Sequence, residues 1–95
     1  MSGYHELKPI YDRQKSFYRK AFVRDCHSYS YLISYNTPVI LVDYNDDTIH
    51  RLWDGYSVTT MRHINEFLKQ NANMDKSKWF SKSEWDNMTV ERSSF

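Results

Sequence analysis

The sequence predicts an α+β domain, with a mainly antiparallel sheet of about four strands followed by a packed helix and a shorter C-terminal helix. Residues 17–53 are rich in β-branched and aromatic residues, and turn-forming residues interrupt them at short intervals. After Gly55 the apolar residues recur at helical spacing. The chain has 95 residues, enough for one hydrophobic core but not two. We therefore expect a single domain over residues 1–95, made of an N-terminal arm (1–12), a sheet (17–53), a main helix (57–72), a short helix (77–88) and a tail (89–95).

Side-chain alternation assigns the faces of the first two predicted strands. In residues 17–25, one face carries Phe17, Ala21 and Val23, and the other carries Tyr18, Lys20, Phe22 and Arg24. Residues 26–28 form the turn that follows. In residues 29–35, one face carries Tyr29, Tyr31, Ile33 and Tyr35, and the other carries Ser30, Leu32 and Ser34. The second strand therefore presents tyrosines on one face and mostly serines on the other.

The third and fourth predicted strands form a hairpin. Residues 36–38 separate the third strand from the second, since Pro38 has no backbone N–H to donate to a neighbouring strand. Residues 39–44 are apolar on both faces, as expected of a central strand. A turn at residues 45–47 leads to the fourth strand, residues 48–53, which ends at Asp54 and Gly55.

The main helix is predicted from an apolar face with the spacing of an amphipathic helix, formed by Val58, Met61, Ile64, Phe67 and Leu68. We expect Ser57 or Thr59 to cap its start, and residues 71–73 to end it. The opposite, solvent-facing side carries Arg62, Asn65, Glu66 and Lys69. Arg62 and Glu66 are spaced to form an ion pair there. His63 is expected to be a solvated or capping side chain.

The second helix is expected around residues 78–88, because Ser83 with Asp86 three residues later resembles a capping box. Trp79, Phe80 and Trp85 supply its apolar surface. The tail after Thr89 is expected to fray.

Charge is distributed unevenly along the chain. Thirteen Lys and Arg are balanced by twelve Asp and Glu, so the net charge is only +1. The overall electrostatic field of the chain therefore does not attract nucleic acid or an anionic membrane. Residues 1–24 carry six cations and two acids (+4), residues 25–56 one and five (−4), and residues 57–95 six and five (+1). The basic first block interleaves its cations with aromatic residues and is a candidate contact surface.

The sequence lacks the patterns that are typical of several functional classes. No stretch is long and apolar enough to span a membrane, and no secretory signal is recognisable, so we expect a cytoplasmic protein. The single cysteine, Cys26, excludes an internal disulfide. No pattern places a general base beside it, so we expect it to be a turn residue and not a catalytic nucleophile. Gly3 and Gly55 are the only glycines, which excludes glycine-rich phosphate loops. We expect no cofactor and no enzymatic activity.

Two patterns in the sequence resemble metal sites, and both are incomplete. Asp43, Asn45, Asp47 and Asp54 fall at four positions of a calcium-loop template, but Thr48 stands where the template needs glycine. Asn and Asp favour turns, so a strand turn is the better interpretation. The four histidines and Cys26 have no zinc-ligand spacing. We therefore expect no metal site.

The candidate partner-binding residues are tyrosines and cations that lie mostly between residues 13 and 35. In the structural interpretation, tyrosines line a sheet face and lysines keep its edge soluble. In the functional one, a sheet face left uncovered by the helix offers tyrosine and arginine contacts, the residue types enriched in interface hot spots. This candidate set is Arg13, Lys15, Tyr18, Lys20, Arg24, Tyr29, Tyr31, Tyr35 and Arg62.

Three segments carry a resemblance to a known family. They are residues 15–21 (KSFYRKA), 34–39 (SYNTPV) and 55–68 (GYSVTTMRHINEFL). Together they make residues 7–71 similar to a family of short uncharacterised proteins encoded by bacteriophages and integrated mobile elements of bacteria. Arg19 departs from that pattern, which has glycine at this position, so we expect the first strand to be regular instead of bulged.

The resemblance implies a genomic setting and, by analogy, a function. Short phage accessory proteins commonly bind and block a host protein, such as a defence nuclease. We therefore expect a non-enzymatic protein that binds and modulates a host macromolecule, most often a protein. The alternative is a nucleic-acid-binding protein whose basic N-terminal residues contact phosphates while tyrosines stack on bases. A homodimer that covers a flat aromatic face is a further possibility.

Overall fold

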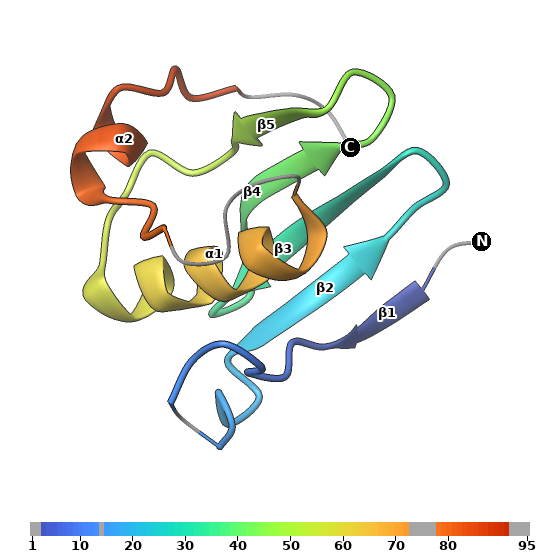
Figure 1. Cartoon of the computed structure of the whole chain (residues 1–95), viewed down its shortest axis with the longest axis vertical. Helices are drawn as coiled ribbons and strands as arrows, with labels where there is room; N and C mark the ends of the chain where they lie inside the picture. Colours follow the sequence, from blue (N-terminus) through green and yellow to red (C-terminus); the bar gives the residue numbers. More distant parts are fainter. Residues whose placement is uncertain (1–2, 14, 73–77, 92–95) are drawn as a thin grey trace.

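Five antiparallel strands form a single sheet with α1 packed on one face, so the α+β prediction is confirmed (Figure 1). The computed structural model describes residues 3–13, 15–72 and 78–91. The strands follow one another in sequence order across the sheet: β1 (Gly3–Glu6), β2 (Ala21–Asp25), β3 (Tyr29–Ser34), β4 (Thr37–Asp43) and β5 (Thr48–Arg51). The helices are α1 (Val58–Asn71) and α2 (Lys82–Asp86).

β1 is a strand that the sequence analysis assigned to an N-terminal arm, and that assignment is wrong for Gly3–Glu6. β1 pairs with β2 along its full length, from Gly3 opposite Asp25 to Glu6 opposite Phe22. The aromatic rings of Tyr4 and Phe22 stack at a centroid distance of 5.3 Å with only 5° between their planes. Such cross-strand aromatic pairs stabilise a sheet edge that has little β-branched sequence.

β2 begins at Ala21, four residues later than predicted, because the chain turns at residues 17–20. Tyr18 and Arg19 have φ angles of 52° and 61°, in the left-handed region. The expectation of a regular strand through Arg19 is therefore wrong, and this backbone has the conformation that favours glycine. Phe17 is still buried together with Ala21 and Val23, as the alternation predicted.

The β3–β4 hairpin turns at Tyr35 and Asn36, whose φ angles of 50° and 66° are typical of a two-residue hairpin turn. The turn therefore lies at residues 35–36 and not at residues 36–38 as predicted, and Pro38 lies inside β4 opposite Ile33. Predicted burial of this strand on both faces is confirmed, since Val39, Ile40, Leu41 and Val42 are all buried.

The sheet has a covered face and an open face. Ser30, Leu32 and Ser34 of β3 are buried beneath α1, whereas Tyr29, Tyr31 and Ile33 point to the other side and are partly exposed. The main core lies between the sheet and the helices and contains Leu7, Phe17, Ala21, Val23, Leu32, Val39, Ile40, Val42, Met61, Ile64, Phe67, Leu68, Phe80 and Trp85. Leu41 is the exception among the buried aliphatic residues of β4, because it faces the open side.

α1 begins after Ser57, whose hydroxyl accepts the N–H of Thr60, so the first of the two predicted caps is confirmed. Met61, Ile64, Phe67 and Leu68 are buried as predicted, but Val58 in the first turn is exposed. The expectation that the opposite side faces solvent is wrong for Asn65 and Glu66, which are both buried. Asn65 pairs through its side-chain amide with the backbone N–H and C=O of Phe80.

The C-terminal segment packs around Arg51, the last residue of β5. Its guanidinium donates to the carbonyl oxygens of Trp53, Gly55 and Trp85 and lies 4.2 Å from the centre of the Trp85 ring. α2 is shorter than predicted, and Ser81 caps it by accepting the N–H of Glu84, so the assignment of a capping box to Ser83 is wrong.

The predicted tail is in part ordered. Val90 forms a parallel bridge with Arg51, and the Glu91 N–H donates to the Arg51 carbonyl. The rest of the predicted tail, residues 92–95, lies outside the described residues, as do residues 73–77 with the start of the predicted second helix.

Candidate functional site

The structure divides the candidate partner-binding residues among four places. Arg24, Tyr29 and Tyr31 lie on the open face of the sheet. The long connection between β1 and β2, residues 7–20, which we call the basic loop, carries Arg13, Lys15, Tyr18 and Lys20. Tyr35 lies in the β3–β4 turn beside it, with the Lys20 ammonium 5.8 Å from its ring centre. Arg62 lies on α1.

The open face carries a continuous row of side chains across all five strands. The register places Tyr4 beside Arg24, Arg24 beside Tyr31, Tyr31 beside Leu41, and Leu41 beside His50. The rings of Tyr29 and Tyr31 stack at 6.3 Å. Leu41 is only 6% exposed although no helix covers it, so the neighbouring side chains of the row shield it. The row is therefore a preformed surface of rings and one exposed guanidinium, that of Arg24.

Charge on the open face is mixed. Glu6 faces the same side as Arg24 through its pairing with Phe22, and Asp43 does so through its pairing with Tyr29. Carboxylates therefore flank the aromatic row at both sides of Arg24. Strand alternation in the sequence predicted Arg24, Tyr29 and Tyr31 as contact residues but not Tyr4, because only the pairing of β1 with β2 brings that tyrosine to this face.

The basic loop is fixed at both ends and in the middle. Its first residue, Leu7, donates its N–H to the Ala21 carbonyl at 2.9 Å, which closes the loop. Leu7 and Phe17 are buried in the core. A long connection whose ends meet and whose own side chains pack beneath it has the features of an Ω-loop, a class of loop that is frequently functional.

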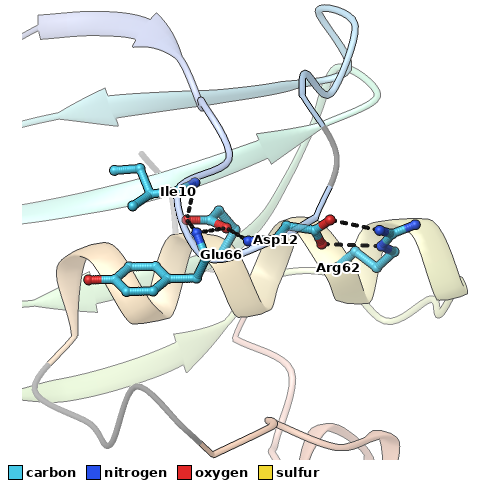
Figure 2. Close-up of polar contacts among 5 residues, drawn as sticks. Ile10, Asp12, Arg62 and Glu66 are labelled. Atoms are coloured by element: carbon cyan, nitrogen blue, oxygen red, sulfur yellow. Dashed lines mark hydrogen bonds and ion pairs between the residues drawn. The ribbon is translucent and has the colours of Figure 1, made fainter.

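Glu66 of α1 holds the middle of the loop. Its carboxylate accepts hydrogen bonds from the successive backbone N–H groups of Ile10, Tyr11 and Asp12, at 2.8 to 3.2 Å (Figure 2). The Gln70 side chain donates to the same carboxylate at 2.6 Å. Glu66 is only 2% exposed, so four donors compensate the cost of burying its charge. Hydrophobic periodicity could not reveal this role, since Glu66 stands on the polar side of the helix.

Arg62 pairs with Asp12 of the loop, and Glu66 is not its partner. The guanidinium donates to both carboxylate oxygens of Asp12, as Figure 2 shows. The predicted Arg62–Glu66 pair on a solvated helix face is therefore wrong, because the basic loop lies over that side of α1. Arg62 helps to position the loop.

His63 is buried, so the expectation of a solvated side chain is wrong. Its Nδ1 atom lies 2.9 Å from the Ser34 hydroxyl, and its ring meets Phe17 edge-on at 4.6 Å. The pKa of His63 is lowered to about 4, chiefly because burial desolvates the ring; the Asp12 carboxylate opposes this shift and the Arg62 charge adds to it. The ring is neutral at physiological pH and anchors the sheet to the helix.

One group of side chains could offer ligands to a cation. Donor atoms of Asp43, Asp46 and His50 lie within 4.8 Å of one another at the β4–β5 hairpin. The Thr48 hydroxyl already bridges two of them, at 2.6 Å from Asp46 and 2.8 Å from the His50 ring, and Glu91 contacts the other ring nitrogen. These contacts stabilise the hairpin and attach the Glu91 segment to it. Cys26 lies in the β2–β3 turn, where its hydrogen bond to Tyr29 raises the pKa of that phenol.

A protein-family model described as a family of unknown function, DUF8033, matches residues 5–87. The chain belongs to this family. The match includes β2–β5, both helices, the basic loop and most of the open face, so both candidate surfaces are parts of the family's domain. It confirms the resemblance to an uncharacterised family. No curated protein and no solved structure matches the chain. None of the helices in the described part of the chain has the length and hydrophobicity to cross a membrane.

Proposed function

We propose that the chain is a small non-enzymatic binding protein that docks a protein partner through the open face of its sheet. In this proposal it is an accessory protein of a bacteriophage or mobile element, acts in the cytoplasm of the bacterial host, and modulates a host protein such as a defence nuclease. The observation that carries the proposal is the row from Tyr4 through Arg24 and Tyr31 to His50, which crosses all five strands of one sheet.

The composition of the row supports a protein interface. Tyrosine and arginine are enriched among the residues that dominate binding energy, and rings held on strands lose little conformational freedom on binding. The partner that fits is a protein surface with apolar groups opposite the rings of Tyr4 and Tyr31 and a carboxylate opposite Arg24.

The charges on this face argue against nucleic acid as its ligand. A nucleic-acid strand that stacks bases on Tyr29 and Tyr31 would bring phosphates close to Asp43, which is paired with Tyr29 and repels them. Only Arg24 on the row carries a permanent positive charge. A protein partner can match mixed charges, whereas a phosphate backbone cannot.

The test compares a variant of the open face with the wild type in affinity capture from host lysate, quantified by mass spectrometry. The variant is Arg24→Glu with Tyr31→Ser. We expect one host protein to be recovered with the wild type and to be depleted about tenfold or more with the variant, since losses at hot spots of about 2 kcal/mol are common.

A matched control variant, Lys78→Glu with Trp79→Ser, makes the same kinds of change at exposed positions outside the sheet. It should recover the partner as well as the wild type does. Equal recovery with all three proteins would contradict the proposal. Thermal melts show whether each variant is folded, and Arg24→Glu alone, at an exposed position, serves if Tyr31→Ser destabilises the sheet.

A further inference from the structure

We propose that the basic loop is a second docking surface, separate from the open face, and that it binds an acidic segment of a protein. The loop carries the exposed cationic side chains Lys8, Arg13, Lys15, Arg19 and Lys20. Its one described acidic residue, Asp12, is paired with Arg62. Exposed apolar and aromatic side chains accompany the cations, namely Ile10, Tyr11 and Tyr18.

The charges of this surface are available to a ligand. Among the described residues, no carboxylate lies in ion-pair contact with any of the five cations of the loop. Within the described part of the chain these cations therefore form no ion pair, unlike Arg62 and Lys82, which pair with Asp12 and Asp86. An anionic partner would supply the missing countercharges.

The loop is also held in place before any ligand binds. Buried Glu66 accepts three successive backbone N–H groups, Gln70 donates to the Lys8 carbonyl, and the Leu7 N–H closes the loop against Ala21. A charged surface on a fixed backbone loses less conformational entropy on binding than one on a flexible tail. The buried carboxylate is the feature that makes this connection a platform.

The turn at Tyr18 and Arg19 supplies an independent observation. Two consecutive non-glycine residues take left-handed φ angles there, a conformation that costs energy for residues with side chains. The strained turn projects Tyr18, the most exposed large hydrophobic residue of the described chain at 72%, beside the Arg19 cation. Backbone strain of this kind concentrates at functional sites.

The negative charge at the border of the surface favours a short acidic protein segment over a nucleic acid. Its border is marked by Glu6, whose carboxylate accepts the Arg19 N–H. A nucleic acid adds phosphates at regular short intervals, and a strand that continued past this border would bring phosphates close to the Glu6 carboxylate. A short run of Asp or Glu with an apolar residue can remain on the loop, opposite Arg13, Lys15 and Tyr18.

The experiment measures fluorescence anisotropy of the full chain with two labelled probes of equal length, an oligoglutamate peptide that contains one tyrosine and an oligothymidylate. We expect the peptide to bind at low ionic strength, to bind more tightly than the oligothymidylate, and to weaken as salt is added. Charge reversal by Arg13→Glu with Lys15→Glu should weaken peptide binding about tenfold or more.

A control with the same change in net charge, Arg24→Glu with Lys78→Glu, distinguishes the loop from a general charge effect and from the open face. It should lower peptide affinity by less than about threefold, because screening weakens distant charges. Absence of peptide binding, equal losses in the two double variants, or tighter binding of the oligothymidylate would each overturn the inference. These results leave the proposal for the open face standing, since its test uses a different variant and a different readout.

Discussion

Arg62 and Asp12 lie 50 residues apart in the chain, yet the guanidinium of one donates to both carboxylate oxygens of the other, at 3.2 and 2.7 Å. The pair ties α1 to the basic loop one helical turn away from Glu66, which binds the same loop through its backbone. The helix therefore has two packed sides: apolar residues face the sheet, and polar residues hold the loop.

Removing the Glu66 carboxylate should destabilise the fold more than removing Arg62. Glu66→Ala leaves three backbone N–H groups without their acceptor, and we expect a loss of about 2–3 kcal/mol in the free energy of unfolding. Arg62→Ala breaks a partly exposed ion pair and should cost about 1 kcal/mol. Urea denaturation of both variants measures the difference. A Glu66→Ala loss no larger than that of Arg62→Ala would show that water replaces the carboxylate.

Stability should fall below about pH 6.5 because of His63. Its pKa is lowered to about 4 in the folded chain, against 6.5 as the ordinary value, so the unfolded chain takes up the proton first as pH falls. The free energy of unfolding therefore drops between about pH 6.5 and 4, by about 3 kcal/mol in total, and is unaffected by this residue at higher pH.

The check is denaturation of the wild type and His63→Gln at several pH values. The carboxylates titrate in both proteins, so the difference between the two curves isolates the histidine. We expect the variant to have the shallower dependence between pH 6.5 and 4. Parallel curves would show that folding leaves the pKa of His63 unchanged.

Gly55→Ala should destabilise the C-terminal packing. A Cβ atom at Gly55 would lie 2.5 Å from Cε2 of the Trp53 ring, so the ring must move. The carbonyl of Gly55 also accepts hydrogen bonds from Arg51 and Trp85. We expect a loss of about 1–3 kcal/mol and a changed tryptophan fluorescence. Gly3→Ala is the control, since no atom lies within 4 Å of its Cβ position, and it should change stability by less than about 0.5 kcal/mol.

Arg19→Gly should stabilise the domain, because glycine adopts the observed φ of 61° without steric cost. The relief of about 1–2 kcal/mol is partly offset by the greater freedom of glycine in the unfolded chain, so we expect a gain of about 0.5–1 kcal/mol. Arg19→Ala removes the same side chain but keeps the strain, and it should give no gain. Equal melting temperatures for both variants would argue against strain at this turn.

The sequence predicted those parts of the fold that depend on periodicity. Alternation in β3 correctly separated Tyr29 and Tyr31 from Ser30 and Ser34, and helical spacing identified Met61, Ile64 and Leu68 as core residues. These patterns work because each records which side of an element is buried.

What the sequence missed is polar burial and long-range pairing. Glu66 and Asn65 are buried because they bind backbone groups of distant segments, and apolar periodicity carries no signal for such contacts. Gly3–Glu6 becomes a strand because β2 offers an edge for pairing, although its own propensity is low. Tyr18 and Tyr29 consequently belong to two surfaces, where the sequence had suggested one.

The most direct test of the central claim is hydroxyl-radical footprinting of the chain alone and in the complex captured from host lysate. The account predicts that oxidation of Tyr4, Phe22 and Tyr31 falls strongly in the complex, because the partner covers the open face. Tyr56 and Trp79, exposed outside the sheet, should be oxidised equally in both samples. Unchanged oxidation of the three open-face rings, with protection elsewhere on the chain, would contradict the account.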